Sequence, residues 1–209
     1  MYKLGESLRL QELKDLGFDP KTILDIGAHT GQFYGWAKNV WPEAFIWMVE
    51  ANTYHSGTLA NIVRNNTDQY TIATLGDAER DVTFYTRSDK PHTEGASYYK
   101  ESAYWDIPQL VMKIPKKLET LDELFDDNTQ FDLIKIDTQG SELDILSGGS
   151  QLCKKASYIL LEVALVSLNE GAPTKEEIIS YMEAYGFSPL LYIGDHYFPS
   201  AAAAENAKV

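Results

Sequence analysis

The chain has 209 residues and a formal net charge of −13, from 18 Lys and Arg against 31 Asp and Glu. Hydrophobic residues make up 44% of the chain and charged residues 23%, which is typical of a globular protein and excludes a fibre or a disordered polymer. The acidic excess argues against a nucleic-acid-binding surface, which needs clustered Lys and Arg, and the single Cys153 excludes an internal disulfide and a cysteine zinc cluster.

The N-terminal residues lack a basic stretch followed by an apolar run, so we expect no signal peptide. No apolar run reaches the roughly 18 residues that a membrane-spanning helix needs. We therefore expect a cytoplasmic protein without a membrane or nucleic-acid partner.

In the first third of the chain, short apolar runs alternate with helix-like stretches. The runs are apolar on both faces, which is typical of a parallel sheet covered by helices on each side. In chain order we expect strands at 22–28, 44–50 and 70–75, with helices at 33–40 and 54–65 between them. The alternation breaks after Asp77, where 82–87 has the period of an antiparallel strand.

Residues 88–106 are predicted to form a long loop, and such loops inside a compact domain are usually functional or disordered. The loop contains the aromatic residues Tyr98, Tyr99, Tyr104 and Trp105. They could stack on a sugar, form a lid, or pack over the edge of the sheet.

Regular elements then return: helices at 121–125, 141–146 and 174–185, and strands at 131–137, 158–163 and 187–193. The first and last of these helices begin with capping-box spacings, Thr120 with Glu123 and Thr174 with Glu177. The sequence therefore predicts one doubly wound, Rossmann-like α/β domain over 1–209, with a core at about 20–193 and a low-complexity tail at 200–209.

The loop after the first strand carries the pattern Asp25-x-Gly27-x-x-x-Gly31, and Glu50 ends the second strand, where an acid can bind ribose hydroxyls. A dinucleotide site needs a second glycine where this chain has His29, and Asp25 would repel a pyrophosphate. S-adenosylmethionine (SAM) has no phosphate and carries cationic ammonium and sulfonium groups, so the carboxylates of Asp25, Glu50 and Asp77 suit it better. An NAD(P)-dependent oxidoreductase remains the alternative.

A second motif spans 131–149, where Lys135 and Asp137 point to the same side of the predicted strand. Asp137 ends that strand beside the expected cleft and is our first candidate for a general base. Lys135 could orient Asp137 or a substrate oxygen, and the other candidate bases are His29, Glu142 and Glu162. Carboxylates of this kind could hold Mg²⁺, but their spacing is not that of a dense ligand set, so we expect no metal.

The two motifs resemble the FkbM family of SAM-dependent methyltransferases over roughly residues 20–190. The matching pieces are 24–31, 49–52, 73–77, 120–124, 134–148 and 160–163, and the pattern D-x-x-G-x-E-x-x-x-L-x-G from Asp137 is the specific one. The family usually has Pro where this chain has Ala51, and the match fades after Ile193, near the family's last antiparallel strand.

The resemblance implies a class I methyltransferase fold, SAM as methyl donor, and O-methylation of a sugar or another secondary metabolite. By position, Gly27, Ala28 and Gly31 would line the methionine portion, while Glu50 and the adjacent Ala51 would lie at the ribose. Asp77 would face the adenine, and Asp137 would lie between cofactor and acceptor. A methyltransferase-like domain that only binds a partner is the second alternative.

Overall fold

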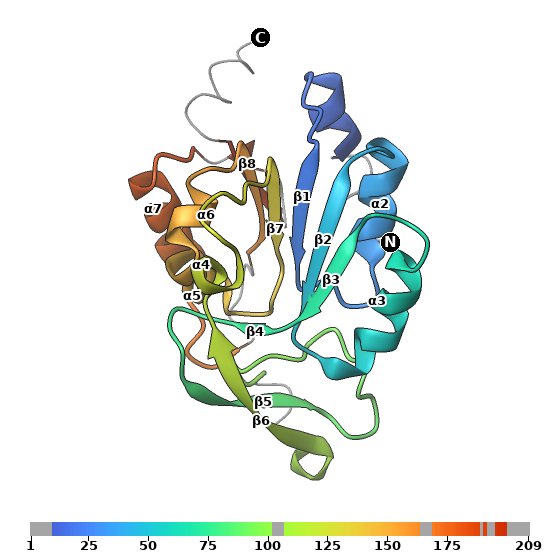
Figure 1. Cartoon of the computed structure of the whole chain (residues 1–209). Helices are drawn as coiled ribbons and strands as arrows, with labels where there is room; N and C mark the ends of the chain where they lie inside the picture. Colours follow the sequence, from blue (N-terminus) through green and yellow to red (C-terminus); the bar gives the residue numbers. More distant parts are fainter. Residues whose placement is uncertain (1–9, 102–106, 164–168, 189, 192–194, 200–209) are drawn as a thin grey trace.

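The protein is described here by a computed structural model that covers residues 10–101, 107–163, 169–188, 190–191 and 195–199 (Figure 1). Its main sheet has the strand order β3-β2-β1-β7-β8-β10-β9. Neighbours among β3, β2, β1, β7 and β8 run parallel, whereas β10 runs antiparallel to both β8 and β9. The strands are β1 (Thr22–Ile26), β2 (Phe45–Glu50), β3 (Gln69–Ile72), β7 (Leu133–Ile136), β8 (Tyr158–Glu162), β9 (Leu190–Leu191) and β10 (Asp195–Pro199).

Helices cover both faces of this sheet (Figure 1). One face carries α2 (Gln32–Val40) and α3 (Ser56–Val63), and the other carries α4 (Leu121–Leu124), α5 (Glu142–Gly148), α6 (Ser150–Cys153) and α7 (Lys175–Ala184). Residues 10–15 are also helical. No helix in the described ranges is long and apolar enough to cross a membrane.

Two buried clusters lie on opposite faces of the sheet, and adjacent residues of one strand enter different clusters. Leu24 and Ile134 pack with α5 and α7 residues, whereas Ile23 and Leu133 pack with α2 residues. The prediction of a parallel sheet buried on both faces is therefore confirmed.

Local capping signals also fold as predicted. The side chains of Thr120 and Thr174 each accept a hydrogen bond from the backbone N–H three residues on. In return, the carboxylates of Glu123 and Glu177 accept the backbone N–H of Thr120 and Thr174, respectively. Gly186, at φ 86°, follows α7 in the left-handed conformation.

A second, three-stranded sheet lies beyond the carboxyl ends of the main strands, with the order β4-β6-β5 (Figure 1). It contains β4 (Thr74–Leu75), β5 (Asp81–Arg87) and β6 (Val111–Glu119), and β5 runs antiparallel to β6. The single strand predicted at 70–75 is wrong, because the pairing of β3 with β2 ends at Ile72 and β4 pairs with β6 instead. Strand β6 was not predicted, because its three lysines and Pro115 hide its period.

Other helices and strands begin or end at residues that differ from the predicted ones. The helix predicted at 54–65 begins as a 3₁₀ turn, η1 (Thr53–His55), and α3 ends at Val63. Another 3₁₀ turn, η3 (Pro108–Leu110), leads into β6. Within the predicted strand 187–193, Leu190 and Leu191 form β9, while residues 189, 192 and 193 lie outside the described ranges. Strand β10 follows at a position that the sequence analysis left without a strand. Tyr104, Trp105 and the tail 200–209 lie outside the described residues.

Asp68 joins α2 to the start of β2 and supplies a stability prediction. Its buried carboxylate lies 2.8 Å from Lys38 Nζ and accepts bonds from Tyr34 Oη at 2.9 Å and from the Ile46 N–H at 2.8 Å. We expect Asp68→Ala to lower the free energy of unfolding by about 3 kcal/mol, because three donors lose their acceptor. Urea unfolding measures the change; a loss below about 1 kcal/mol, as for an exposed ion pair, would contradict it.

Candidate cofactor and acceptor site

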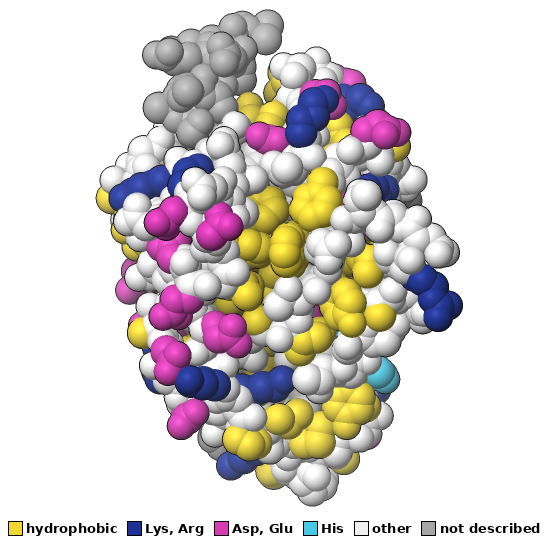
Figure 2. Space-filling view, viewed as in Figure 1, with side chains coloured by type: hydrophobic (Ala, Val, Ile, Leu, Met, Phe, Trp, Pro, Cys, Tyr) yellow, Lys and Arg dark blue, Asp and Glu magenta, His cyan; other side chains and the backbone are white. Residues whose placement is uncertain are grey.

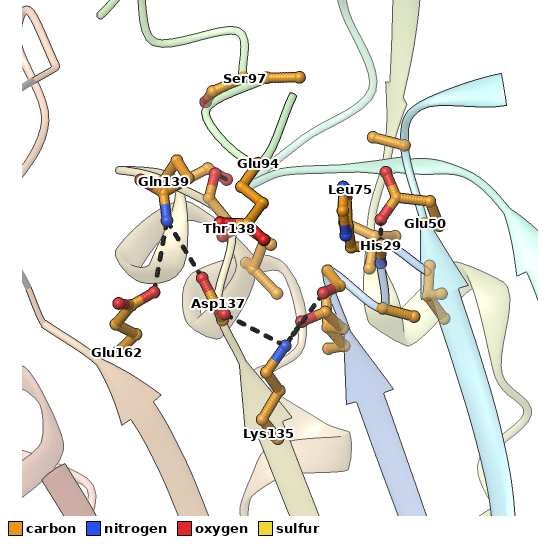
Figure 3. Close-up of a pocket in the computed structure, with 18 of the residues that line it drawn as sticks. His29, Glu50, Leu75, Glu94, Ser97, Lys135, Asp137, Thr138, Gln139 and Glu162 are labelled. Carbon is orange, nitrogen blue, oxygen red and sulfur yellow. Dashed lines mark hydrogen bonds and ion pairs between the residues drawn. The ribbon is translucent and has the colours of Figure 1, made fainter. Parts of the chain in front are cut away.

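A cavity of about 310 Å³ lies where β1, β2, β7 and β8 end (Figure 3). The loops after these strands form one wall, and residues of β4, β5 and the segment 93–98 form the opposite one. The sequence analysis placed the site at the carboxyl ends of the strands, and the cavity lies there.

The loop after β1 depends on Gly27. Gly27 has φ 76°, and a Cβ atom there would lie 1.8 Å from the carbonyl oxygen of Asp137. Gly27 and Ala28 therefore bring bare backbone to the cavity wall, and their part in binding a cofactor stays a prediction. Gly31 (φ 80°) does not line the cavity; a Cβ there would meet Ile62 at 2.4 Å, so its role is to pack α2 against α3.

Glu50 lies at the end of β2 with 8% of its surface exposed. Its Oε2 accepts the His29 N–H at 2.7 Å, and its Oε1 accepts the Asn52 N–H at 2.6 Å. Burial raises the pKa of Glu50, although these backbone bonds and the nearby His29 and Lys135 oppose the rise. Each oxygen keeps a lone pair for a ligand hydroxyl, and Ala51 lines the cavity next to it.

Lys135 connects the two motifs from below (Figure 3). Its Nζ lies 3.2 Å from Asp25 Oδ1 and 3.5 Å from Asp137 Oδ2, and it donates to the Gly27 carbonyl at 3.0 Å. Burial alone would lower the pKa of Lys135, but the charges of Asp25 and Asp137 outweigh burial and raise it. Lys135 therefore stays protonated and ties the β1 loop to β7.

Asp25 is fully buried behind the cavity wall and is not one of the residues that line it. Burial raises its pKa against the opposing charge of Lys135. The sequence analysis expected Asp25 to face a cationic ligand, and this placement corrects that expectation: Asp25 reaches the cavity only through Lys135.

Asp137 opens into the cavity, with 33% of its side chain exposed. Burial favours a raised pKa, but the charge of Lys135 and hydrogen bonds with Glu162, Gln139 and Lys135 lower the pKa of Asp137 below its usual value. The carboxylate is thus ionised at neutral pH. The sequence analysis did not name Gln139, although it stands between Asp137 and Gly140 in the motif; Glu162, at the end of β8, completes this group (Figure 3).

Glu142 does not line the cavity, so its candidacy as a base is corrected. Its buried carboxylate accepts the N–H groups of Thr138 and Gly140, both at 3.0 Å, and so holds the turn after β7. Asp77 is exposed, pairs with Arg80 and lies off the cavity, so it does not face an adenine subsite there.

The rest of the cavity was not predicted residue by residue. One end is lined by apolar side chains from β1, β2, β4, β5 and α5, namely Ile26, Val49, Leu75, Phe84 and Ile145. Another part is lined by Phe33 and Trp36 of α2 and by Leu160 of β8. Apolar side chains carry no signal that separates a cavity wall from a core.

The segment 91–99, within the predicted long loop, covers the cavity and is fastened at both ends. The carbonyls of Pro91 and His92 lie 2.7 Å from Asn52 Nδ2 and 2.9 Å from His29 Nε2. At the other end, the hydroxyls of Tyr98 and Tyr99 both donate to Asp144 Oδ2 at 2.9 Å. His29 thus contacts the covering segment. The predicted role of His29 as a candidate base stays a prediction.

The fold is similar to those of two solved structures. SAM-bound CalS10, an amino pentose methyltransferase from Micromonospora echinaspora, matches with a TM-score of 0.54 and 9% identity, over 96% of this chain and 92% of that chain. DesVI from Streptomyces venezuelae matches with a TM-score of 0.55 and 7% identity, over 96% and 92% of the two chains. At these identities the likeness concerns the fold alone.

No curated protein matches the sequence significantly. The methyltransferase FkbM domain, in contrast, matches residues 25–189, which include both glycine motifs, the β2 acid and the strand β8 that ends at Glu162. The family suspected from the two motifs and the doubly wound sheet is thereby confirmed: the chain belongs to the FkbM methyltransferase domain family.

Proposed function

We propose that this SAM-dependent methyltransferase transfers a methyl group to a hydroxyl of a sugar or a similar polar metabolite. The observation that carries the proposal is the ionised carboxylate of Asp137, which opens into the cavity beside the Gly27 loop. A carboxylate at that place can accept the proton of an acceptor hydroxyl.

The residues present fit SAM. Gly27 and Ala28 expose backbone for the methionine portion, and Glu50 keeps acceptor capacity for the two ribose hydroxyls. The apolar end around Leu75 and Ile145 suits the adenine ring. Neither His29 nor Glu50 offers a group that would bind a pyrophosphate, and this fits a nucleoside ligand without phosphates.

The part of the cavity near Asp137 suits a sugar. Trp36 and Phe33 form an aromatic wall, against which the apolar face of a sugar ring can pack. Gln139, Glu94 and Glu162 supply polar groups for ring hydroxyls on the other sides (Figure 3). Because three of the nearby side chains are carboxylates, an acceptor that carries a carboxylate or phosphate would be repelled.

Bound SAM supplies an electrophilic methyl group on a sulfonium. The protein contributes orientation of the acceptor oxygen, which is worth about 7–11 kcal/mol in well-aligned reactions, and a base, worth roughly 10²–10⁴-fold. Asp137 would take the hydroxyl proton as the acceptor oxygen bonds to the methyl carbon in place of sulfur, which would leave S-adenosylhomocysteine (SAH) as the second product. Lys135 stays protonated throughout and holds Asp137 at the cavity.

The test incubates the protein with SAM labelled in its methyl group and a panel of neutral, amine-bearing and carboxylate-bearing sugars. Mass spectrometry then locates the label. We expect an O-methyl product from a neutral or amine-bearing sugar. Label on nitrogen, label only on acidic sugars, or SAH binding without any turnover across a broad hydroxyl panel would contradict the proposal.

Glu50 makes SAH binding sensitive to pH. In Glu50→Gln, an amide N–H₂ or a single carbonyl must face two backbone N–H donors, so we expect SAH affinity to fall roughly tenfold to hundredfold. In the wild type, burial raises the pKa of Glu50, so on acidification affinity should decline at a higher pH than an exposed glutamate would titrate. Calorimetry measures both effects. Glu176→Gln, at an exposed site on α7, is the control; equal affinity in Glu50→Gln would refute the assignment.

A further inference from the structure

Gln139 adopts a backbone conformation that glycine would adopt at no cost. It has φ 57° and stands between Asp137 and Gly140 in the turn after β7. Among the described residues, only His29 and Gln139 are non-glycine residues with positive φ, and both line the cavity. A left-handed conformation is unfavourable for a long side chain such as Gln. Such a backbone conformation persists only where the surrounding contacts of the residue hold it.

The side chain of Gln139 bridges two carboxylates from different strands (Figure 3). Its Nε2 lies 3.3 Å from Asp137 Oδ1 and 3.3 Å from Glu162 Oε2. An amide nitrogen has two N–H donors, so each carboxylate can receive one. The opposite amide orientation would set a carbonyl oxygen against two acids, and is disfavoured for that reason.

The two oxygens of Asp137 are thus held from opposite sides. Oδ1 faces Gln139 at 3.3 Å, and Oδ2 faces the Lys135 ammonium at 3.5 Å. Lys135, on β7, and Gln139, in the turn after β7, approach different oxygens and so restrict the rotation of the carboxylate, in addition to its hydrogen bond with Glu162. The hydrogen bond from Gln139 is also one of the causes that lower the pKa of Asp137.

We infer that Gln139 is a positioning residue for the methyl transfer: its amide aligns the Asp137 carboxylate at the cavity and links it to Glu162. This inference rests on the proposed function, in which Asp137 accepts the hydroxyl proton. A glycine at this position would relieve the backbone but remove the amide donor that Asp137 and Glu162 share, which explains why a strained glutamine serves better.

The test follows the Asp137 carboxyl carbon by carbon NMR in the SAH-saturated protein, with the signal assigned by its absence in Asp137→Asn. Gln139→Met keeps the length of the side chain and removes its donors. We expect the proton affinity of Asp137 to rise roughly fivefold, which is the effect of losing one neutral hydrogen bond, so that the titration moves to higher pH. Gln151→Met, at an exposed glutamine of α6, should leave the titration unchanged.

Gln139→Gly separates positioning from folding. It should raise the proton affinity of Asp137 as Gln139→Met does, yet unfold at a higher temperature than Gln139→Met, because it removes the left-handed strain. In the methylation assay, both variants should lose about tenfold in kcat, with the acidic limb of the pH profile moved to higher pH and SAH affinity within about twofold of the wild type.

Two results would overturn the inference. One is an Asp137 titration that is identical in the wild type and both Gln139 variants. The other is a loss of activity with an unmoved pH profile that scales with the loss of thermal stability across the two variants. Failure of the wild type to bind SAH would instead overturn the proposed function, so the two failures are distinguishable.

Discussion

Asp137→Asn should lower the rate of methyl transfer by roughly 10²–10⁴-fold, which is the usual contribution of a general base. The amide cannot accept the hydroxyl proton, while the geometry of the β7 turn stays close to that of the wild type. SAH affinity should change by less than about threefold, because the carboxylate serves the acceptor and not the ribose or adenine. Initial rates with labelled SAM and calorimetry with SAH measure the two effects.

The control for this variant is Asp127→Asn, an exposed carboxylate after α4 that is distant from the cavity lining. It should leave both rate and affinity unchanged. The residual activity of Asp137→Asn should increase with pH, since hydroxide can replace the lost base. A rate within about tenfold of the wild type would show that another group accepts the proton, and His29 would then be the next candidate.

Gly27→Ala should abolish SAH binding and lower the free energy of unfolding by roughly 3–5 kcal/mol. The φ of 76° disfavours any Cβ atom, and the added atom would lie 1.8 Å from the Asp137 carbonyl oxygen, so the β1 and β7 loops must separate. Since these loops form the cavity wall, the damage reaches the ligand site as well as the fold. Urea unfolding and calorimetry with SAH check the two parts.

Gly35→Ala is the matched control. Gly35 lies on the exposed side of α2, and a Cβ atom there would meet nothing within 4 Å. Because alanine favours the helix interior, this change should raise the free energy of unfolding by about 0.5–1 kcal/mol and leave SAH affinity unaltered. Wild-type SAH binding in Gly27→Ala would contradict the role assigned to the β1 loop.

Figure 2 shows hydrophobic side chains gathered in the middle of one face of the molecule, with Asp and Glu side chains along its left side. The main sheet was easier to predict than the elements inserted beside it. Trp47 of β2 packs edge-on against Phe125, which follows α4. Between β3 and β7 the chain inserts β4, β5, β6 and the short α4. The insertion pairs Thr74 with Leu118, residues far apart in the sequence. No local pattern announces such a pairing, so β6 and the division of 70–75 were missed.

The candidate site divides in the same way. Strand parity placed Lys135 and Asp137 on one side and brought Asp137 to the cavity, as the structure shows. The alternation of side chains along a strand does not show how far a side chain lies from the cavity. Asp25 pairs in register with Lys135, inside the sheet, and is buried behind the cavity wall. Glu142 likewise shares the motif with Asp137 but turns its carboxylate back to the Thr138 and Gly140 N–H groups.

The amino-acid sequence by itself determined the doubly wound sheet, both capping boxes and the family, because these depend on residue spacing along one strand, helix or turn. Only the tertiary structure decided which acids face the cavity, since that depends on contacts between distant segments. Gln139 Nε2 lies 3.3 Å from Glu162 Oε2, and Gly27 lies so close to the Asp137 carbonyl that no Cβ atom fits between them. Such contacts arise only after the strands pair, and they separate the acids that can act on a ligand from those that support the fold.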